Sequence, residues 1–245
     1  MIKIKNLLEE LDALLGRNDY PSALELLLRA EQNVQEDHSA LVTVYNELIG
    51  LNRKLNREAD ALLYSKKALE LLDKIGENTV AGATTQINAA TAFKAFGRAE
   101  ESIELFRKAR KTYEEKLPEN DGRLGGLYNN MALTLVDLKK FQEARELYSL
   151  ALIQCDKQKN GVWERAITLL NLASLVEEEK GLELGAEEIE KLTKEAAESL
   201  NAKIDFSSGY YAFVCEKCAT VFGYYGHFAF EAELNERARK IYERT

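Results

Sequence analysis

The strongest constraint on the fold is a pair of helical patterns that lies between Tyr128 and Ala151. Each half places apolar or small residues three and four positions apart, so that they share one face of a helix. Between the halves, Lys139, Lys140 and Phe141 predict a turn. The residues of the two faces are Tyr128, Met131, Ala132 and Leu135, then Ala144, Tyr148 and Ala151. This pattern predicts an antiparallel helix pair whose helices cross closely at Ala132 and Ala144.

The same arrangement recurs along the 245-residue chain. Six alanines, each expected to close a second helix, follow one another at spacings of 38, 41, 42, 45 and 42 residues: Ala30, Ala68, Ala109, Ala151, Ala196 and Ala238. In the fifth repeat, the run Lys180 to Gly185 predicts an enlarged turn before a second helix at about 186–200. We therefore expect one solenoid domain over residues 1–245, with repeats at about 4–37, 40–75, 80–116, 121–158, 162–200 and 208–245.

These motifs resemble the tetratricopeptide repeat (TPR) family, whose pattern runs through a large residue, Leu-Gly, an aromatic, then Ala, Phe and Ala. The spacing is longer than the usual period of about 34 residues. In this respect the chain is similar to kinesin light chains and to bacterial peptide-sensing regulators. The sixth repeat departs from the family pattern, because Glu231 and Asn235 stand where a small and an aromatic residue are usual. The resemblance implies an all-α fold, an α-α superhelix (TPR-like solenoid) of about six antiparallel helix pairs.

Composition narrows the class of partner. The formal net charge of −8 disfavours a nucleic-acid backbone and favours a basic peptide or protein. The N-terminus lacks the apolar core of a secretion signal, and no run approaches the roughly 18 apolar residues of a membrane span. The three cysteines form no disulfide framework, so we expect a cytoplasmic protein with reduced thiols.

The sequence shows no catalytic constellation, so we expect no enzyme and no cofactor. The one candidate metal motif is Cys215-x2-Cys218, which lacks a second pair of ligands. Both cysteines share a helix face with Ala219 and Phe222, which favours core packing over zinc binding.

The opposite face of the first helices carries the candidate binding residues. Asn88, Asn130 and Asn171 recur there at spacings of 42 and 41. A carboxamide both donates and accepts, so it can bind the backbone of an extended peptide, and the family resemblance implies such a use. Charged residues flank these positions: Lys54 and Lys94 towards the N-terminus, and Asp137 and Glu178 towards the C-terminus. The alternative is that all seven are polar residues of a solvated helix face.

Aromatic residues concentrate between Phe206 and Phe230. Tyr210, Tyr211, Tyr224 and Tyr225 cannot all be buried on one helix face, so they are candidates for an interface; a well-filled last core is the alternative. We therefore predict a non-catalytic protein- or peptide-binding module with a concave groove lined by the first helices. The alternatives are a homo-oligomeric scaffold that associates through the aromatic C-terminal repeat, and a regulatory sensor that responds to a peptide.

Overall fold

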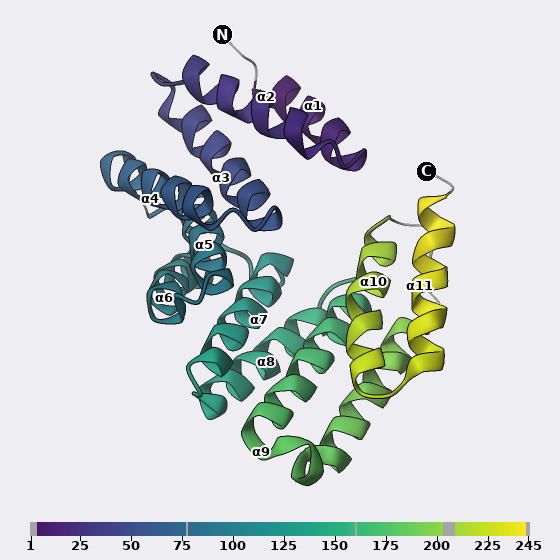
Figure 1. Cartoon of the computed structure of the whole chain (residues 1–245). Helices are drawn as coiled ribbons and strands as arrows, with labels where there is room; N and C mark the ends of the chain where they lie inside the picture. Colours follow the sequence, from purple (N-terminus) through teal and green to yellow (C-terminus); the bar gives the residue numbers. More distant parts are fainter. Residues whose placement is uncertain (1–3, 77, 160, 203–208, 244–245) are drawn as a thin grey trace. The chain divides into compact units, whose positions relative to one another are not determined.

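The computed structural model describes residues 4–76, 78–159, 161–202 and 209–243, which form eleven α-helices and no strand (Figure 1). Phe206 lies outside these described residues. The helices follow one another as antiparallel pairs, which confirms the predicted all-α fold. They are α1 (Ile4–Gly16), α2 (Tyr20–Asn33), α3 (His38–Lys54), α4 (Glu58–Ile75), α5 (Val80–Ala95), α6 (Ala99–Lys116), α7 (Gly122–Asp137), α8 (Phe141–Asp156), α9 (Gly161–Leu200), α10 (Gly209–Tyr224) and α11 (Phe228–Tyr242).

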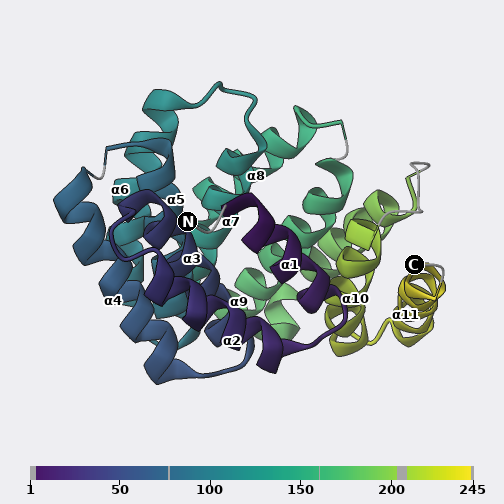
Figure 2. The same ribbon diagram turned by 90° about the horizontal axis from the view of Figure 1, so that it is seen from above.

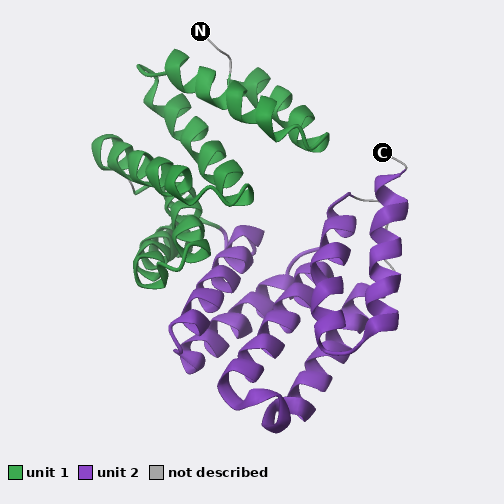
Figure 3. Ribbon diagram, viewed as in Figure 1, with its two compact units in different colours: residues 1–117 green, residues 118–245 purple. Residues whose placement is uncertain are grey.

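The chain divides into two compact units, residues 1–117 and residues 118–245 (Figure 3). Unit 1 holds α1 to α6, and a core of leucines, alanines and tyrosines joins its successive helix pairs. Unit 2 holds α7 to α11, and its last two pairs share a core that includes Trp163, Tyr211 and Phe222. Within unit 2, α10 packs beside α11 (Figures 1 and 2). In the described part of the chain, no helix combines the length and apolar character that a bilayer span requires.

Five of the six turns inside the helix pairs share one backbone geometry, and the turn at Gly181 differs from them. Between α7 and α8, the Lys140 N–H donates to the Leu135 carbonyl (2.8 Å) and the Lys139 N–H to the Val136 carbonyl (2.9 Å). This is the Schellman arrangement, which needs one residue at positive φ. Each of the six pairs has such a residue at its turn: Asn18 (φ 56°), Asn56 (54°), Gly97 (75°), Lys139 (56°), Gly181 (77°) and Gly226 (86°).

The turn of the fifth pair differs from the prediction. The break in α9 is confined to Gly181 (φ 77°, ψ 164°), and the helix resumes directly after it. The expected enlarged turn from Lys180 to Gly185 is therefore wrong, because the extra residues lengthen the helices instead. Gly185 lies inside the second helix and is buried, and a Cβ there would lie 2.9 Å from Val176 Cγ1. Ala196, the alanine expected to close this second helix, is fully buried.

The fourth residue of each second helix lies where the two helices of a pair cross. Five of these residues are small and buried: Ala23, Ala61, Ser102, Ala144 and Gly185. The sixth is Glu231, which the sequence had marked as irregular. Gly223 on α10 makes room for it, since a Cβ at Gly223 would overlap the Glu231 carboxylate. A small residue on the opposite helix thus compensates for the large one.

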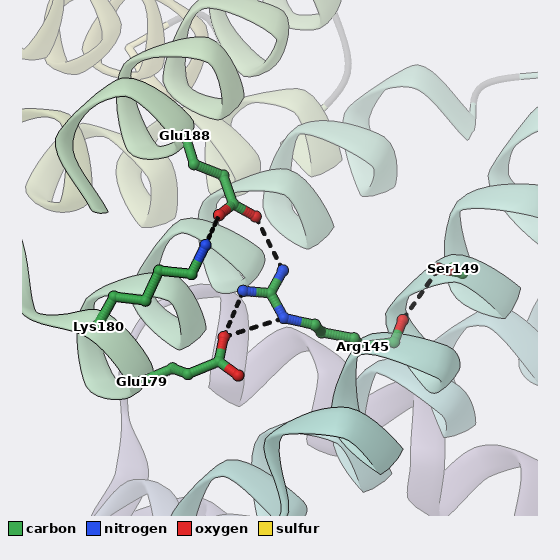
Figure 4. Close-up of polar contacts among 5 residues, drawn as sticks. All are labelled: Arg145, Ser149, Glu179, Lys180 and Glu188. Carbon is green, nitrogen blue, oxygen red and sulfur yellow. Dashed lines mark hydrogen bonds and ion pairs between the residues drawn. The ribbon is translucent and has the colours of Figure 1, made fainter. Parts of the chain in front are cut away.

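An ion-pair network braces the break in α9 (Figure 4). Arg145 on α8 donates to Glu179, which precedes the break (2.5 Å), and to Glu188, which follows it (2.8 Å). Lys180 also binds Glu188, at 2.7 Å. The hydrogen bond from Lys180 is the main cause that lowers the pKa of the Glu188 carboxyl below its usual value, and the hydrogen bond from Arg145 adds to it. The network links α8 to both parts of α9.

Candidate functional site

The first helices bury the faces that the periodicity predicts. Tyr128, Met131, Ala132 and Leu135 are all buried in α7, and Ala144, Tyr148 and Ala151 are buried in α8. The opposite face of α7 is open: Gly126 and Asp137 are exposed, and Asn130 is half-buried. This face of α7 is therefore accessible to solvent, and its role in binding stays a prediction.

Asparagines on successive first helices bind one another rather than standing separately. In unit 1, Asn88 Nδ2 donates to Asn46 Oδ1 (3.1 Å), and Asn46 Nδ2 donates to Thr85 Oγ1 (2.9 Å). In unit 2, Asn171 Nδ2 donates to Asn129 Oδ1 (3.1 Å). Sequence reasoning selected Asn88 and Asn171 but missed their partners. The partners, Asn46 and Asn129, each lie one residue before the position that the repeat alignment selects on their helix. Asn88 and Asn171 follow them at a spacing of 42 residues, and this spacing is the signal that could have found them.

Each unit has a cavity at equivalent positions of its repeats. The cavity of unit 1 has a volume of about 410 Å³, and that of unit 2 about 540 Å³. Each is bounded by the N-terminal half of one first helix, the C-terminal end of the following second helix, and the start of the next first helix. In unit 1 these are α3, α4 and α5, with Thr43, Asn46 and Thr84 among the lining residues.

The cavity of unit 2 is built mainly from α7, the end of α8 and the start of α9, with a further wall from α10. Gly126 leaves space along α7, because no atom lies within 4 Å of a Cβ built on it, whereas the side chains of Gln158 and Gln154 pack against Gly122 and Gly125. Of the predicted binding residues, Asn130 lines this cavity. Its lining comprises Gly122, Gly125, Gly126, Asn129, Asn130, Gln154, Cys155, Gln158, Lys159, Gly161, Glu164, Ile167, Thr168, Tyr210, Phe213 and Lys217.

Two oxygen atoms on residues that line this cavity have no hydrogen-bond partner within the described residues. They are Gln154 Oε1 and Glu164 Oε2, and both atoms are buried. The whole Gln154 side chain is 7% exposed. Buried polar atoms are normally satisfied, so a polar cavity with two free acceptors is a candidate for ligand binding.

Aromatic rings of α10 form one side of the cavity. Tyr210 and Phe213 stack at 6.1 Å between centroids, and 45% and 49% of their surfaces are exposed. Trp163 lies behind Tyr210, with centroids 6.0 Å apart. The pKa of the Tyr210 hydroxyl is raised, mainly because the residue is buried. The negative charge of Glu164 and a hydrogen bond to this carboxylate raise the pKa further. Tyr210 and Glu164 are therefore close neighbours.

The predicted flanking charges take part in local contacts. Lys54 Nζ lies 4.8 Å from the centroid of the Tyr20 ring, and Glu178 pairs with Lys139 at 2.5 Å. Lys94 is half-buried near the end of α5, and Asp137 is exposed at the end of α7. None of these four residues lines either cavity described above. Their role in binding stays a prediction.

The four candidate interface tyrosines separate into different environments. Tyr210 and Tyr224 are exposed, Tyr225 is half-buried, and Tyr211 is 1% exposed. The Tyr211 hydroxyl donates to the Leu200 carbonyl (3.1 Å) and accepts from Arg237 (2.8 Å). The prediction of an interface role is therefore wrong for Tyr211, because the fold satisfies its hydroxyl inside the core. Tyr224 and Tyr225 both donate to Glu177.

The cysteines pack in the core as the helix periodicity indicates. Cys215 and Cys218 are 0% and 1% exposed, and Cys155 is also buried. Burial raises the pKa of the Cys218 thiol to about 12 and that of Cys155 to about 11. The described residues include no cluster of three or more potential metal ligands.

Comparison with known proteins places this architecture among helical repeats. No family model and no curated protein matches the sequence. Solved structures do match. BtubC (BKLC) from P. vanneervenii is 19% identical with a TM-score of 0.59, over 92% of this chain and 90% of that chain. A putative kinesin light chain of Podosopora anserina with TPR-like repeats is 16% identical with a TM-score of 0.57, over 82% and 94%.

A Rap protein, solved in complex with competence and sporulation factor, is 16% identical with a TM-score of 0.64. The match covers 98% of this chain and 64% of that one. Together with the helix pairs and their conserved turn geometry, these similarities define the class: the chain has the fold of TPR-like helical-repeat proteins.

Proposed function

We propose that this protein is a non-catalytic module that binds an extended peptide or protein segment against the first helices of its repeats. The observation that carries the proposal is the cavity of unit 2, which opens on the predicted binding face and contains Asn130. The equivalent cavity of unit 1 supports it, because the same elements of two different repeats leave the same kind of space. The Rap protein of similar fold was solved with a bound factor, which is compatible with this use of the fold.

The chemistry of the cavity suits a peptide backbone. Asn130 and Gln158 offer side-chain amide groups, and Gly126, with no atom within 4 Å of its Cβ position, permits a chain to approach α7 closely. Such groups bind backbone C=O and N–H without selecting side chains. The described lining contains no pairing of a nucleophile with a base that would indicate chemistry.

The decisive variant fills the cavity without unfolding the protein. Gly126 is an exposed residue of α7, and no atom lies within 4 Å of a Cβ built on it. Gly126→Leu should therefore keep or raise helix stability while it occupies the space that a peptide needs. Ser149→Leu on α8 is the matched control, because Ser149 is exposed and lies outside the cavity.

The probe is a phage-displayed library of random decapeptides selected on the wild-type protein. Selected peptides should bind Gly126→Leu at least tenfold more weakly in titration calorimetry, and Ser149→Leu with unchanged affinity. If the library yields no binder, or if Gly126→Leu binds as the wild type does, the proposal is wrong.

The asparagines provide a second test, in which effects on stability and on binding can be separated. Asn88 and Asn171 each donate a hydrogen bond to another first helix, so their replacement by alanine should cost about 0.5–1.5 kcal/mol each in folding free energy. Within the described residues, the Asn130 side chain makes no hydrogen bond to an asparagine of another first helix, so Asn130→Ala should leave the melting temperature nearly unchanged. A loss of peptide affinity in Asn130→Ala therefore reports binding rather than folding.

One observation favours self-association as a second candidate function. Tyr224 and Phe228, at the turn between α10 and α11, are 64% and 70% exposed. Sedimentation velocity over a concentration series distinguishes the two functions, since a Phe228→Ser variant should dissociate an oligomer built on this turn. If a bound peptide instead changes the sedimentation coefficient of the monomer, the result would favour the third alternative, a regulatory sensor whose shape responds to a peptide.

A further inference from the structure

The cavity of unit 2 has a defined imbalance between hydrogen-bond acceptors and donors. Gln154 Oε1 and Glu164 Oε2 are buried acceptors that no described residue satisfies. Asn129 Oδ1, a third acceptor in the lining, is already occupied by Asn171. An unmet buried acceptor costs about 1–3 kcal/mol, and more when it is charged. A ligand that brings donors and no acceptor would remove this cost.

The charges of the cavity lining differ in their exposure. Glu164 is half-buried, and its unsatisfied oxygen is shielded from solvent. Lys159 and Lys217 also line the cavity, but both are exposed, so water and salt screen their charges. Among the described residues, neither Lys159 nor Lys217 forms an ion pair with Glu164. The innermost charge is therefore negative.

The aromatic wall adds a second kind of recognition. Tyr210 and Phe213 present stacked, half-exposed rings at the same cavity. Tyr210 is also a neighbour of the Glu164 carboxylate. A flat cation that lies on an aromatic face gains attraction from the ring, in addition to its attraction to a carboxylate.

We propose that the cavity of unit 2 receives the guanidinium group of an arginine side chain carried by the bound peptide, with Glu164 and Gln154 as its acceptors and Tyr210 and Phe213 as its stacking surface. This inference rests on the proposed peptide-binding function and specifies its ligand. A guanidinium has five N–H donors and no acceptor, and it is planar, so its chemistry suits both the acceptors and the aromatic rings of the lining. A lysine ammonium offers no flat surface, and a carboxylate would face Glu164.

The experiment compares arginine with citrulline, which has nearly the same shape but no charge. The probes are N-acetylated, C-amidated heptapeptide mixtures in which the central residue is fixed and the other six positions are random uncharged residues. The central residue is Arg, citrulline, Lys, Leu or Glu. Because the six other peptide positions are uncharged, Lys159 and Lys217 have no charged peptide residue other than the central one to attract or repel. Affinity selection with mass spectrometry on the full-length protein measures retention of each mixture.

Wild-type protein should retain the arginine mixture about tenfold more strongly than the citrulline mixture. In Glu164→Gln, which keeps the side-chain shape, this ratio should fall to about one. Glu183→Gln is the matched control, since Glu183 is exposed on α9 outside the cavity, and its ratio should equal that of the wild type. Phe213→Ala, a change at a half-exposed ring, should reduce arginine retention about two- to fivefold.

Failure of this inference is distinguishable from failure of the proposed function. Equal retention of arginine and citrulline by the wild type, or an unchanged ratio in Glu164→Gln, overturns the arginine assignment. If the retained peptides are then still lost in Gly126→Leu, peptide binding at the cavity stands without it. Retention that is insensitive to Gly126→Leu contradicts both.

Discussion

Ala132 shows how little space separates the two helices of a pair. It is fully buried in α7, as is Ala144 in α8. Ala132→Leu adds three carbon atoms to this crossing, so it should overpack the pair and lower the free energy of unfolding by roughly 1–3 kcal/mol. Urea titration measures the change. Ala95→Leu, at an exposed position of α5, is the control, and equal stabilities for the two variants would contradict the crossing.

The three cysteine side chains should react slowly in the native protein. All are buried, and their raised pKa values keep them as thiols at pH 7, whereas the thiolate is the reactive form. A colorimetric thiol reagent should label them slowly without denaturant and label three groups per chain in guanidinium. Elemental analysis should find no stoichiometric zinc. Rapid native labelling or one zinc per chain would overturn the core assignment.

At the scale of elements, Gly181 allows one continuous stretch of helix to become two. Its φ of 77° with ψ of 164° belongs to a region that is nearly restricted to glycine. Gly181→Ala should therefore destabilise unit 2 by about 1–3 kcal/mol. Gly126→Ala, in ordinary helical conformation with free space around it, should instead stabilise the protein by about 0.5–1 kcal/mol. Thermal melts of both variants test this, and a neutral Gly181→Ala would contradict the turn geometry.

The network around Glu188 predicts a pH dependence. Its folded-state pKa is lowered, so its contribution to stability is present above the unfolded pKa and is lost as the pH falls through the folded one. The side chains of Arg145, Glu188 and Lys180 are about a quarter to two fifths exposed, so solvent weakens these ion pairs. Glu188→Gln should therefore lower the free energy of unfolding by only about 0.3–1 kcal/mol at pH 7. The difference from wild type should shrink as the pH falls and should vanish once Glu188 is protonated in the folded protein. Glu183→Gln is the control, and a difference that persists in acid would exclude an ionic cause.

Periodicity predicted the helices because their buried faces repeat without interruption. It misjudged α9 because two glycines suggested a loop, whereas Gly185 is small for a helix crossing and only Gly181 breaks the helix. It placed Asn130 on the open face of α7, where this residue lines the cavity of unit 2, and a role of Asn130 in binding stays a prediction. It could not find Gln154 or Glu164, since their importance comes from missing partners, which depend on how three helices meet.

At the scale of the whole molecule, the two compact units each have a core of their own. The fragment 118–245 should therefore fold alone, with a helical circular dichroism spectrum and a cooperative melt. It should also retain the peptides selected on the full chain, because all residues of the larger cavity belong to it. An unfolded fragment would favour the single cooperative domain that the sequence predicts. A folded fragment that binds no peptide would locate binding elsewhere.

The contact of Glu231 with Gly223 influences how this chain can change during evolution. A side chain introduced at position 223 would overlap the Glu231 carboxylate, so this flexible side chain would have to turn away from the crossing. A smaller residue at position 231 removes the overlap without such a movement. We therefore expect residues larger than glycine at position 223 to be more frequent among those descendants of this sequence that have lost Glu231.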